Sequence, residues 1–238
     1  MENGRFTLSK MVHPPLRSQI DFNDFDLGEL DISLLDLISE QDTVSMNVTS
    51  LSGVDRSGFE FNHLATLMSL GKTHMHFKNL EINTGDSDLH IPDFGFDFGK
   101  WKDFKQFSRQ VDIFFHSTQS ELQMDDLSVF VPETRGLLDR LTVDGHVHGR
   151  LNDLKGNDLQ ITFNRQSTLA FDFTIIGLPD FKNSFLDFDF KELNSSVTAL
   201  YETFSGRDAA DHSLYPWNNL GDLGFRGRFT GYPDNFVA

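Results

Sequence analysis

The chain contains no cysteine, which excludes disulfide bonds, thiolate nucleophiles and zinc sites built on thiolates. Its 238 residues include only 2 Trp and 3 Tyr against 25 Phe. Trp and Tyr carry a polar group that suits a half-wet binding surface, whereas Phe carries none. The aromatic residues therefore favour dry surroundings, and a glycan-binding platform is disfavoured.

The chain also lacks long hydrophobic runs and an excess of basic residues. No stretch approaches the roughly 20 apolar residues of a membrane-spanning helix, and residues 1–15 contain no apolar run, so no signal peptide is expected. The net charge of −16 leaves no basic stripe for phosphates, which disfavours nucleic acid and anionic lipid surfaces as partners. The acidic residues fit the polar positions of strands and are interpreted as a solvated face.

Residues 139–192 alternate between apolar and polar with a period of two, over four consecutive segments. Such alternation predicts β-strands whose successive side chains point to opposite faces of a sheet. One face of these four strands is therefore apolar and the other is charged. The residues predicted on the apolar face are Leu141, Val143, Val147, Leu159, Ile161, Phe163, Leu169, Phe171, Phe173, Ile175, Leu186, Phe188 and Phe190.

Further alternating segments, at spacings of roughly 8 to 14 residues, predict strands along most of the chain, which is the rhythm of an all-β architecture. The segment at residues 89–98 contains Pro92, and this predicts an edge strand or a bulge because proline cannot donate a hydrogen bond to the sheet. Alternating apolar residues predict another strand at residues 127–132.

Two short helices are predicted. Aromatic residues recur at three-residue spacing in residues 100–109, and residues 194–204 have an apolar face with Asn194 or Ser195 as a cap. Two short helices cannot cover so many strands. The apolar face must be covered by the sheet itself, covered by a partner chain, or left as a concave surface for a lipid-like ligand. Alternation alone favours the self-covered sandwich, the commonest all-β solution.

An internal repeat is visible at residues 143–154 and 225–236. Both segments carry an apolar-x-Gly-x-apolar-x-Gly frame, followed by an acidic or amide pair and a hydrophobic residue. The glycines fall on the inward phase, where a missing side chain lets the strand coil or another backbone approach. We therefore expect residues 1–238 to be a single segment of a longer repetitive sheet, with repeat-like units starting near residues 143 and 225.

Sequence patterns typical of metal-binding or catalytic sites are weak. His74 with His76, and His146 with His148, could each offer two ligands to a metal, but both pairs fall on the polar phase and no third ligand is placed. No nucleophile elbow, phosphate-binding loop or dinucleotide-binding fingerprint is present. The sequence predicts no catalytic residue, no metal site and no cofactor, and the chain is predicted not to be an enzyme.

From about residue 70 onward, the order of motifs resembles that of one protein family. In chain order the motifs are Ser120-x-Leu122, Asp126-Leu127-x-x-Phe130-x-Pro132, Val143-x-Gly-x-Val-x-Gly149, Leu159-x-Ile-x-Phe163, Gly177-Leu-Pro-Asp180, the Phe/Asp segment at residues 185–190, and Phe225-x-Gly-x-Phe-x-Gly231. Single motifs are weak, but their order and spacing are similar to those of the TamB branch of the AsmA-like proteins, in its Bacteroidetes-type form.

The resemblance implies an all-β fold, an elongated antiparallel sheet curled into a β-taco or β-trough with an apolar interior. It implies a non-enzymatic groove for phospholipid acyl chains, used in phospholipid transport to the outer membrane and in outer-membrane protein assembly. Family members span the periplasm from an inner-membrane anchor and meet a TamA-type outer-membrane partner. This chain carries neither the anchor nor the C-terminal region that meets the partner, so both are expectations about the full-length protein.

A second hypothesis is a β-rich scaffold or interaction module. Its sheet would cover its own core, and exposed strand edges would pair with client β-strands. The two hypotheses differ in the role of the inward residues, which contact acyl chains in the first and form ordinary core in the second. An enzyme on a β-sandwich has the least support.

Overall fold

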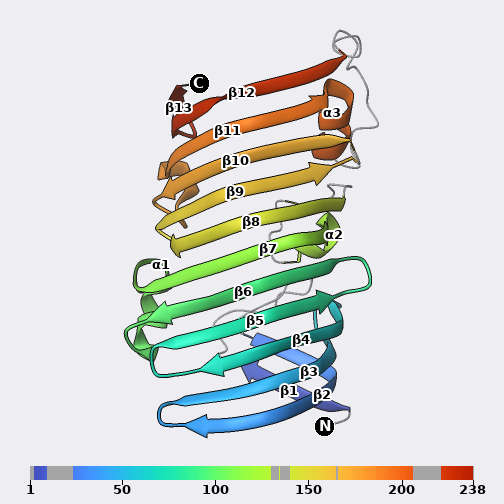
Figure 1. Ribbon diagram of the computed structural model, residues 1–238, viewed down its shortest axis with the longest axis vertical. Coiled ribbons are helices and arrows are strands. Elements are labelled where there is room, and N and C mark those ends of the chain that lie inside the picture. The colour runs from blue at the N-terminus through green and yellow to red at the C-terminus, as the bar shows by residue number, and fades with distance from the viewer. Residues whose placement is uncertain are drawn as a thin grey trace.

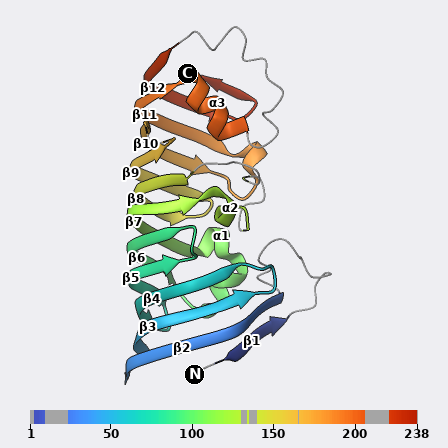
Figure 2. The same cartoon turned by 90° about the vertical axis from the view of Figure 1, so that its right-hand side faces the viewer.

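The computed structural model describes residues 3–9, 24–129, 134, 140–164, 166–205 and 221–237. Within these residues, one antiparallel sheet of thirteen strands follows the order of the chain from β1 to β13 (Figure 1). The sheet curls, and across the described part of the chain no second sheet covers either face (Figure 2). The curled all-β sheet is thus confirmed, and the self-covered sandwich that alternation alone favoured is wrong.

The strands are β1 (Gly4–Ser9), β2 (Asp24–Glu40), β3 (Thr43–Asp55), β4 (Glu60–Leu70), β5 (His74–Asn83), β6 (Asp88–Phe98), β7 (Val111–Gln123), β8 (Arg140–Arg150), β9 (Asp153–Phe163), β10 (Ser167–Ile176), β11 (Phe185–Ser196), β12 (Asp222–Tyr232) and β13 (Asn235–Val237). The α-helices are α1 (Phe107–Gln110), α2 (Met124–Leu127) and α3 (Val197–Ser205), and the 3-10 helices are η1 (Trp101–Gln106) and η3 (Phe181–Asn183). Strands β8 to β11 are the four predicted at residues 139–192.

Residues paired directly across antiparallel strands lie on the same face of a sheet. The pairing therefore defines an apolar row that crosses the sheet from β3 to β12. Its members are Met46, Met68, Phe77, Phe94, Phe115, Val147, Gly156, Phe173, Phe188 and Phe229. We call the face that carries this row the inner face, and the helices α1, α2 and α3 lie on its side of the sheet (Figure 2).

Bulges in the strands bend the sheet. Gln119 in β7 and Asp158 in β9 have positive φ angles of 47° and 52°, and the register with the neighbouring strand shifts beside each. The backbone N–H of Gln119 donates to Asp144 Oδ1 at 2.7 Å, and that of Asp158 donates to Asp172 Oδ1 at 2.8 Å. A bulge bends its strand and increases the local twist. Outward carboxylates thus hold the backbone where the sheet curls.

Two of the predicted strands differ in the structure. β6 contains Pro92 but lies between β5 and β7, so the expectation of an edge strand is wrong. The alternative expectation of a bulge is also wrong, because the register of β6 with β5 and with β7 carries no shift, and Asp88 and Asp93 pair with Glu121 and His116 at the same spacing on both strands. The strand predicted at residues 127–132 is wrong where it is described: Leu127 ends α2, and residues 130–132 lie outside the described residues.

The helix predicted at residues 100–109 is confirmed as η1 followed directly by α1. It begins where Asp103 Oδ2 accepts a hydrogen bond from the backbone N–H of Lys100 at 2.9 Å. Two short helices were not predicted, α2 and η3, because four and three residues are too few to show a period.

The helix predicted at residues 194–204 begins later than expected. Asn194 and Ser195 belong to the end of β11, and the first helical residue of α3 is Val197. Ser196 Oγ accepts a hydrogen bond from the backbone N–H of Ala199 at 3.0 Å, which is the geometry of an N-cap. The cap is therefore Ser196, and neither of the two predicted residues.

Candidate functional site

All of the residues predicted on the apolar face lie on the inner face of β8 to β11. Phe171 pairs with Leu159 and Phe190, for example, and Val143 pairs with Ile161. Three of the set are buried, with exposed fractions of 7% for Leu159, 2% for Phe163 and 6% for Leu186. The others are half-buried: Leu141, Val143, Val147, Ile161, Leu169, Phe171, Phe173, Ile175, Phe188 and Phe190.

Five phenylalanines at the centre of this surface form one cluster, which we call the Phe cluster: Phe171, Phe173, Phe188, Phe190 and Phe225. Neighbouring ring centroids within it lie 5.8 to 6.2 Å apart. Such spacing gives contact between the rings. Four of the rings are half-buried and Phe225 is 43% exposed, so the cluster is an apolar floor that the described residues cover only in part.

Glycine at one position lets the Phe cluster lie flat on the sheet. Gly156 faces inward in β9, where it pairs with Val147 and Phe173. A Cβ added to Gly156 would overlap the ring of Phe173 and come within 2.6 Å of Leu159 Cδ1. The ring therefore occupies the space that a side chain on β9 would fill.

Aromatic residues of β6 pack against rings from the helical segment that follows it. η1 and α1 place Trp101, Phe104 and Phe107 against Phe96 and Phe98 of β6. The ring centroids of Phe98 and Phe104 lie 4.9 Å apart, and Phe98 is only 6% exposed. We call these five residues the capped cluster; Phe98 is buried beneath it, Phe96, Phe104 and Phe107 are half-buried, and Trp101 is 49% exposed at its edge.

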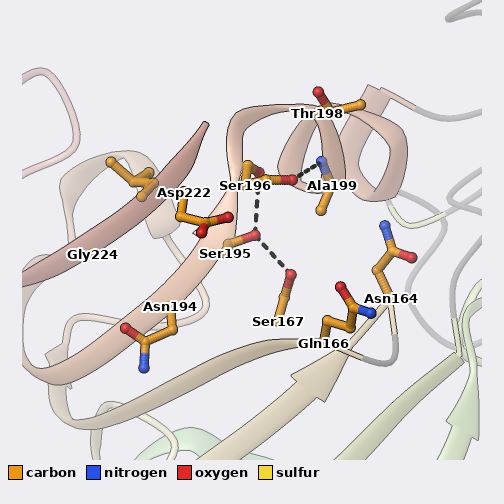
Figure 3. A pocket seen from close by; sticks show the side chains of 11 residues that line it. Asn164, Gln166, Ser167, Asn194, Ser195, Ser196, Thr198, Ala199, Asp222 and Gly224 are labelled. Atoms are coloured by element: carbon orange, nitrogen blue, oxygen red, sulfur yellow. Dashed lines mark hydrogen bonds between the residues drawn. The ribbon is translucent and has the colours of Figure 1, made fainter. Parts of the chain in front are cut away.

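A polar hollow of about 670 Å³ lies at the α3 end of β10, β11 and β12 (Figure 3). We call it the rim pocket; sequence reasoning missed it, because its residues come from the ends of several elements. Its lining residues are Asn164, Gln166, Ser167, Asn194, Ser195, Ser196, Thr198, Ala199, Asp222, Leu223 and Gly224. The side chains of Ser167 and Ser195 hydrogen bond to each other at 2.7 Å.

The outer face carries a network of ion pairs. Arg228 donates to both carboxylate oxygens of Asp187, at 2.7 and 2.6 Å, and these bonds hold the pKa of Asp187 below its ordinary value. The backbone N–H of Asp158 lowers the pKa of Asp172, and Lys191 Nζ adds to the effect at 3.0 Å from that carboxylate. The charged side chains of the outer face are therefore suited to contact with solvent.

The two histidine pairs noted in the sequence lie on this outer face, in β5 and β8. His76 Nε2 lies 2.8 Å from Asp97 Oδ1, and the ring of His146 stacks on that of His116 with centroids 4.1 Å apart. Across the residues that the structure describes, no group of three or more His, Cys, Asp or Glu could hold a metal ion. In the same residues, no helix is both long and apolar enough to cross a membrane.

The site also extends beyond the set predicted from residues 139–192. The N-terminal members of the apolar row, such as Phe77, Phe94 and Phe115, continue the same surface. Alternation revealed their strands, but only the register shows that they share the inner face with the Phe cluster.

Comparison of the chain with protein-family models, with curated proteins and with solved structures found no match.

Proposed function

We propose that this chain is a non-enzymatic segment of a TamB-like protein, and that its inner face is a groove for phospholipid acyl chains. One observation supports the proposal: an apolar row from β3 to β12 whose aromatic members are only half-buried in the described residues. A monomeric soluble protein rarely exposes so long an apolar patch unless the patch binds something.

The physical basis is passive transfer. A hydrocarbon chain gains ~0.8 kcal/mol for each methylene that leaves water for an apolar surface. A continuous row offers the same surface at every strand, so a chain can move along it without meeting a polar barrier. The ion pairs of the outer face and the net charge of −16 keep the other side in water.

The cellular role that accompanies this proposal comes from the resemblance. It is phospholipid transport to the outer membrane and assembly of outer-membrane proteins, in the periplasm, by a full-length protein tethered to the inner membrane. A TamA-type partner would be met through a region outside this chain. These statements concern the whole protein, whereas the groove concerns the residues described above.

Native mass spectrometry of the purified chain, with lipid extraction alongside, tests the groove. We expect co-purifying phospholipid in the wild type and its loss in Phe173→Asp, which places a charge in the Phe cluster. The control is Thr174→Asp, on the next residue of β10, which faces outward between Lys155 and Asp187. Asp172 is a poor control, because its carboxylate holds the bulge at Asp158.

Two results would contradict the proposal. One is a wild-type chain that is free of lipid and melts cooperatively as a monomer. The other is equal lipid binding by Phe173→Asp and Thr174→Asp, with circular dichroism showing that both variants are folded.

A scaffold that pairs with client strands is the second candidate. β13 pairs only with Thr230, Gly231 and Tyr232 of β12, so no strand of the described chain lies along the outer edge of residues 223–228. An open edge offers backbone groups to an added strand. For this function Arg226→Pro should abolish client binding, whereas Phe173→Asp should change only stability.

A further inference from the structure

The two ends of the sheet carry stepped strand edges. β2 and β12 lie at opposite ends of the longest axis of the molecule (Figure 1). At the first end, β1 covers β2 along residues 24–30, and no described strand lies beside residues 31–40. At the other end, β13 covers β12 along residues 230–232, and residues 223–228 are open in the described chain. We call β1 with β2 the β2 end, and β12 with β13 the β12 end.

The two steps have complementary shapes. All neighbouring strands are antiparallel, and an even number of such pairs separates β2 from β12, so these two strands run in the same direction. β12 is open at its start, whereas β2 is covered at its start and open at its end. When a β12 end meets the β2 end of a second copy, β1 and β13 therefore lie in line, in one strand position between β12 and β2. The six residues of β1 match the length of the open residues 223–228.

Exposed apolar side chains gather at these two ends. In the described part of the chain, thirteen large apolar residues are exposed, and nine of them belong to β1, β2, β12 and β13. Pairing with another strand would remove these side chains from water, so the open edges favour association. The nine residues are Phe6, Leu34, Leu35, Leu37, Ile38, Leu223, Phe225, Tyr232 and Val237.

The exposed residues also match in the face on which they lie. The register places Phe6 and Phe225 on the inner face, and Leu35 and Val237 on the outer face. Their exposed fractions are 50%, 43%, 57% and 71% in that order. Fitting the two steps together places Phe6 on the same face as Phe225 of the other copy, and Val237 on the same face as Leu35. Apolar side chains therefore meet on both sides of the joint.

Charge distinguishes the possible ways of joining two ends. β1 and β2 contain six acidic residues and one arginine, whereas β12 and β13 contain two arginines and one aspartate. Two β2 ends would bring like negative charges together, and two β12 ends would bring together Arg226 and Arg228 of both copies. Contact between unlike ends brings acidic residues and arginines together. Electrostatic complementarity thus favours head-to-tail contact.

We propose that copies of this chain associate head to tail, with the β12 end of one copy fitted to the β2 end of the next. β1 of the second copy pairs with residues 223–228 of the first, and β13 of the first pairs within residues 31–40 of the second. The partner at this surface is thus a second copy of the chain. The sheet and its inner face continue from copy to copy. This inference goes beyond the proposed function and does not require that the trough binds lipid.

Sedimentation velocity across a concentration series, without added lipid, measures this association. A head-to-tail contact leaves one open end of each kind on every assembly, so the assembly does not close. We expect monomers, dimers, trimers and longer species whose share grows with concentration. A wild type that stays monomeric, or one that stops at a dimer, would overturn the proposal.

Variants blocked at one end give a sharper test. Phe6→Asp blocks the β2 end and Leu223→Asp blocks the β12 end, because each places a charge in the contact. Each variant alone should associate about tenfold more weakly than the wild type. An equal mixture should form a heterodimer and nothing larger, because only one pair of compatible ends is left. Wild-type association of either variant alone, or a monomeric mixture of variants that circular dichroism shows to be folded, would contradict the proposal.

A second pair of variants repeats the test in the other half of the joint. Leu35→Asp blocks the β2 end and Val237→Asp blocks the β12 end, at side chains so exposed that a charge should leave the fold intact. This pair decides the question if a variant of the first pair does not fold, and a mixture that fails to form the heterodimer overturns the proposal.

Two controls complete the experiment. Phe181→Asp changes a residue of η3 that is 54% exposed and belongs to neither end, so it should associate like the wild type. Weaker association of this variant would mean that exposed apolar residues in general cause the effect, and would overturn the proposal. Phe173→Asp, which should lose lipid from the groove, should also associate like the wild type. The groove and the head-to-tail contact can therefore fail separately.

Discussion

The four strands β6 to β9 and the four strands β10 to β13 are built on one plan. Each set runs as a strand, a short helical connection, a strand, a helix and two further strands joined by a tight turn. The register repeats as well, because Gly149 pairs with Leu154 in the first set and Gly231 pairs with Phe236 in the second. The glycine frame seen twice in the sequence thus marks the same strand-to-strand geometry twice.

The two sets differ in what covers the inner face. In the first, the connection between strands is η1 with α1, whose aromatic residues form the capped cluster on Phe96 and Phe98. In the second, the connection is η3, of three residues, and its Phe181 is 54% exposed. The same scaffold therefore packs the rings of a helical connection onto the inner face in one part of the trough, where they bury Phe98, and places no such rings on the Phe cluster in the other part. We expect ligand binding at the Phe cluster.

The largest expected effect comes from truncating one aromatic residue in each part. Phe98→Ala removes a ring that is 6% exposed and should lower the free energy of unfolding by ~3–5 kcal/mol. Phe188→Ala removes a half-buried ring. Its free energy of unfolding should fall by about half as much, because less of this ring leaves water on folding. Urea unfolding followed by circular dichroism measures both, and equal losses would mean that the second part is covered as well.

The stabilisation that added lipid gives should also distinguish Phe98→Ala from Phe188→Ala. An occupied groove stabilises the folded chain by mass action. Phe188→Ala should therefore lose more of the stabilisation that added lipid gives than Phe98→Ala does. A capped cluster that responded to lipid as strongly as the Phe cluster would break the comparison.

A smaller loss of stability is expected when a buried serine hydroxyl is removed. In both sets such a hydroxyl, at the start of one strand, hydrogen bonds to a residue near the end of another. In the first set Ser87 donates to Asp126 Oδ2 and accepts from the N–H of Gln123, whereas in the second Ser167 bonds to Ser195. Ser87→Ala should cost ~1.5–3 kcal/mol because the lost bond is to a charged group. Ser167→Ala should cost ~1 kcal/mol, as a bond between neutral groups.

A double-mutant cycle checks this assignment. In Ser167→Ala the hydroxyl of Ser195 is left buried, whereas Ser167→Ala with Ser195→Ala removes both groups. The double variant should therefore be less destabilised than the sum of the two single variants. Simple additivity would show that the two serines do not act as a pair.

Much of the fold was readable in the sequence because period-two alternation depends on each strand alone. Residues 139–192 gave four strands with the correct inward set, and the glycine frame gave the repeat. Features that depend on distant partners were not readable. Pro92 could not show that β7 would pair beyond it, and the apolar row needed the register of nine strand pairs. The rim pocket joins the ends of β9, β10, β11 and β12 with α3, and no single segment carries its signature.

The smallest expected effect concerns the carboxylates that hold the bulges, Asp144 in the first set and Asp172 in the second. Asparagine keeps an acceptor for the bulge N–H but removes the charge. Asp172 also pairs with Lys191, so Asp172→Asn should cost ~0.5–1 kcal/mol at pH 7 and Asp144→Asn less. Urea unfolding at pH 7 measures both free energies. A larger cost for Asp144→Asn would show that the ion pair between Asp172 and Lys191 does not explain the difference between the two variants.

The difference in unfolding free energy between the wild type and Asp172→Asn should depend on pH. The N–H of Asp158, with Lys191, lowers the pKa of Asp172 from its ordinary value of 3.8. A depressed pKa means that the unfolded chain binds the proton first, so the stabilisation is complete above about pH 5 and is lost as the pH falls through the folded-state pKa. The wild type should therefore lose its advantage over Asp172→Asn on acidification, and the two unfolding free energies should converge below the folded-state pKa. A gap that stayed constant from pH 7 to pH 2.5 would show that the charge of Asp172 does not stabilise the bulge, and that its geometry alone holds the strand.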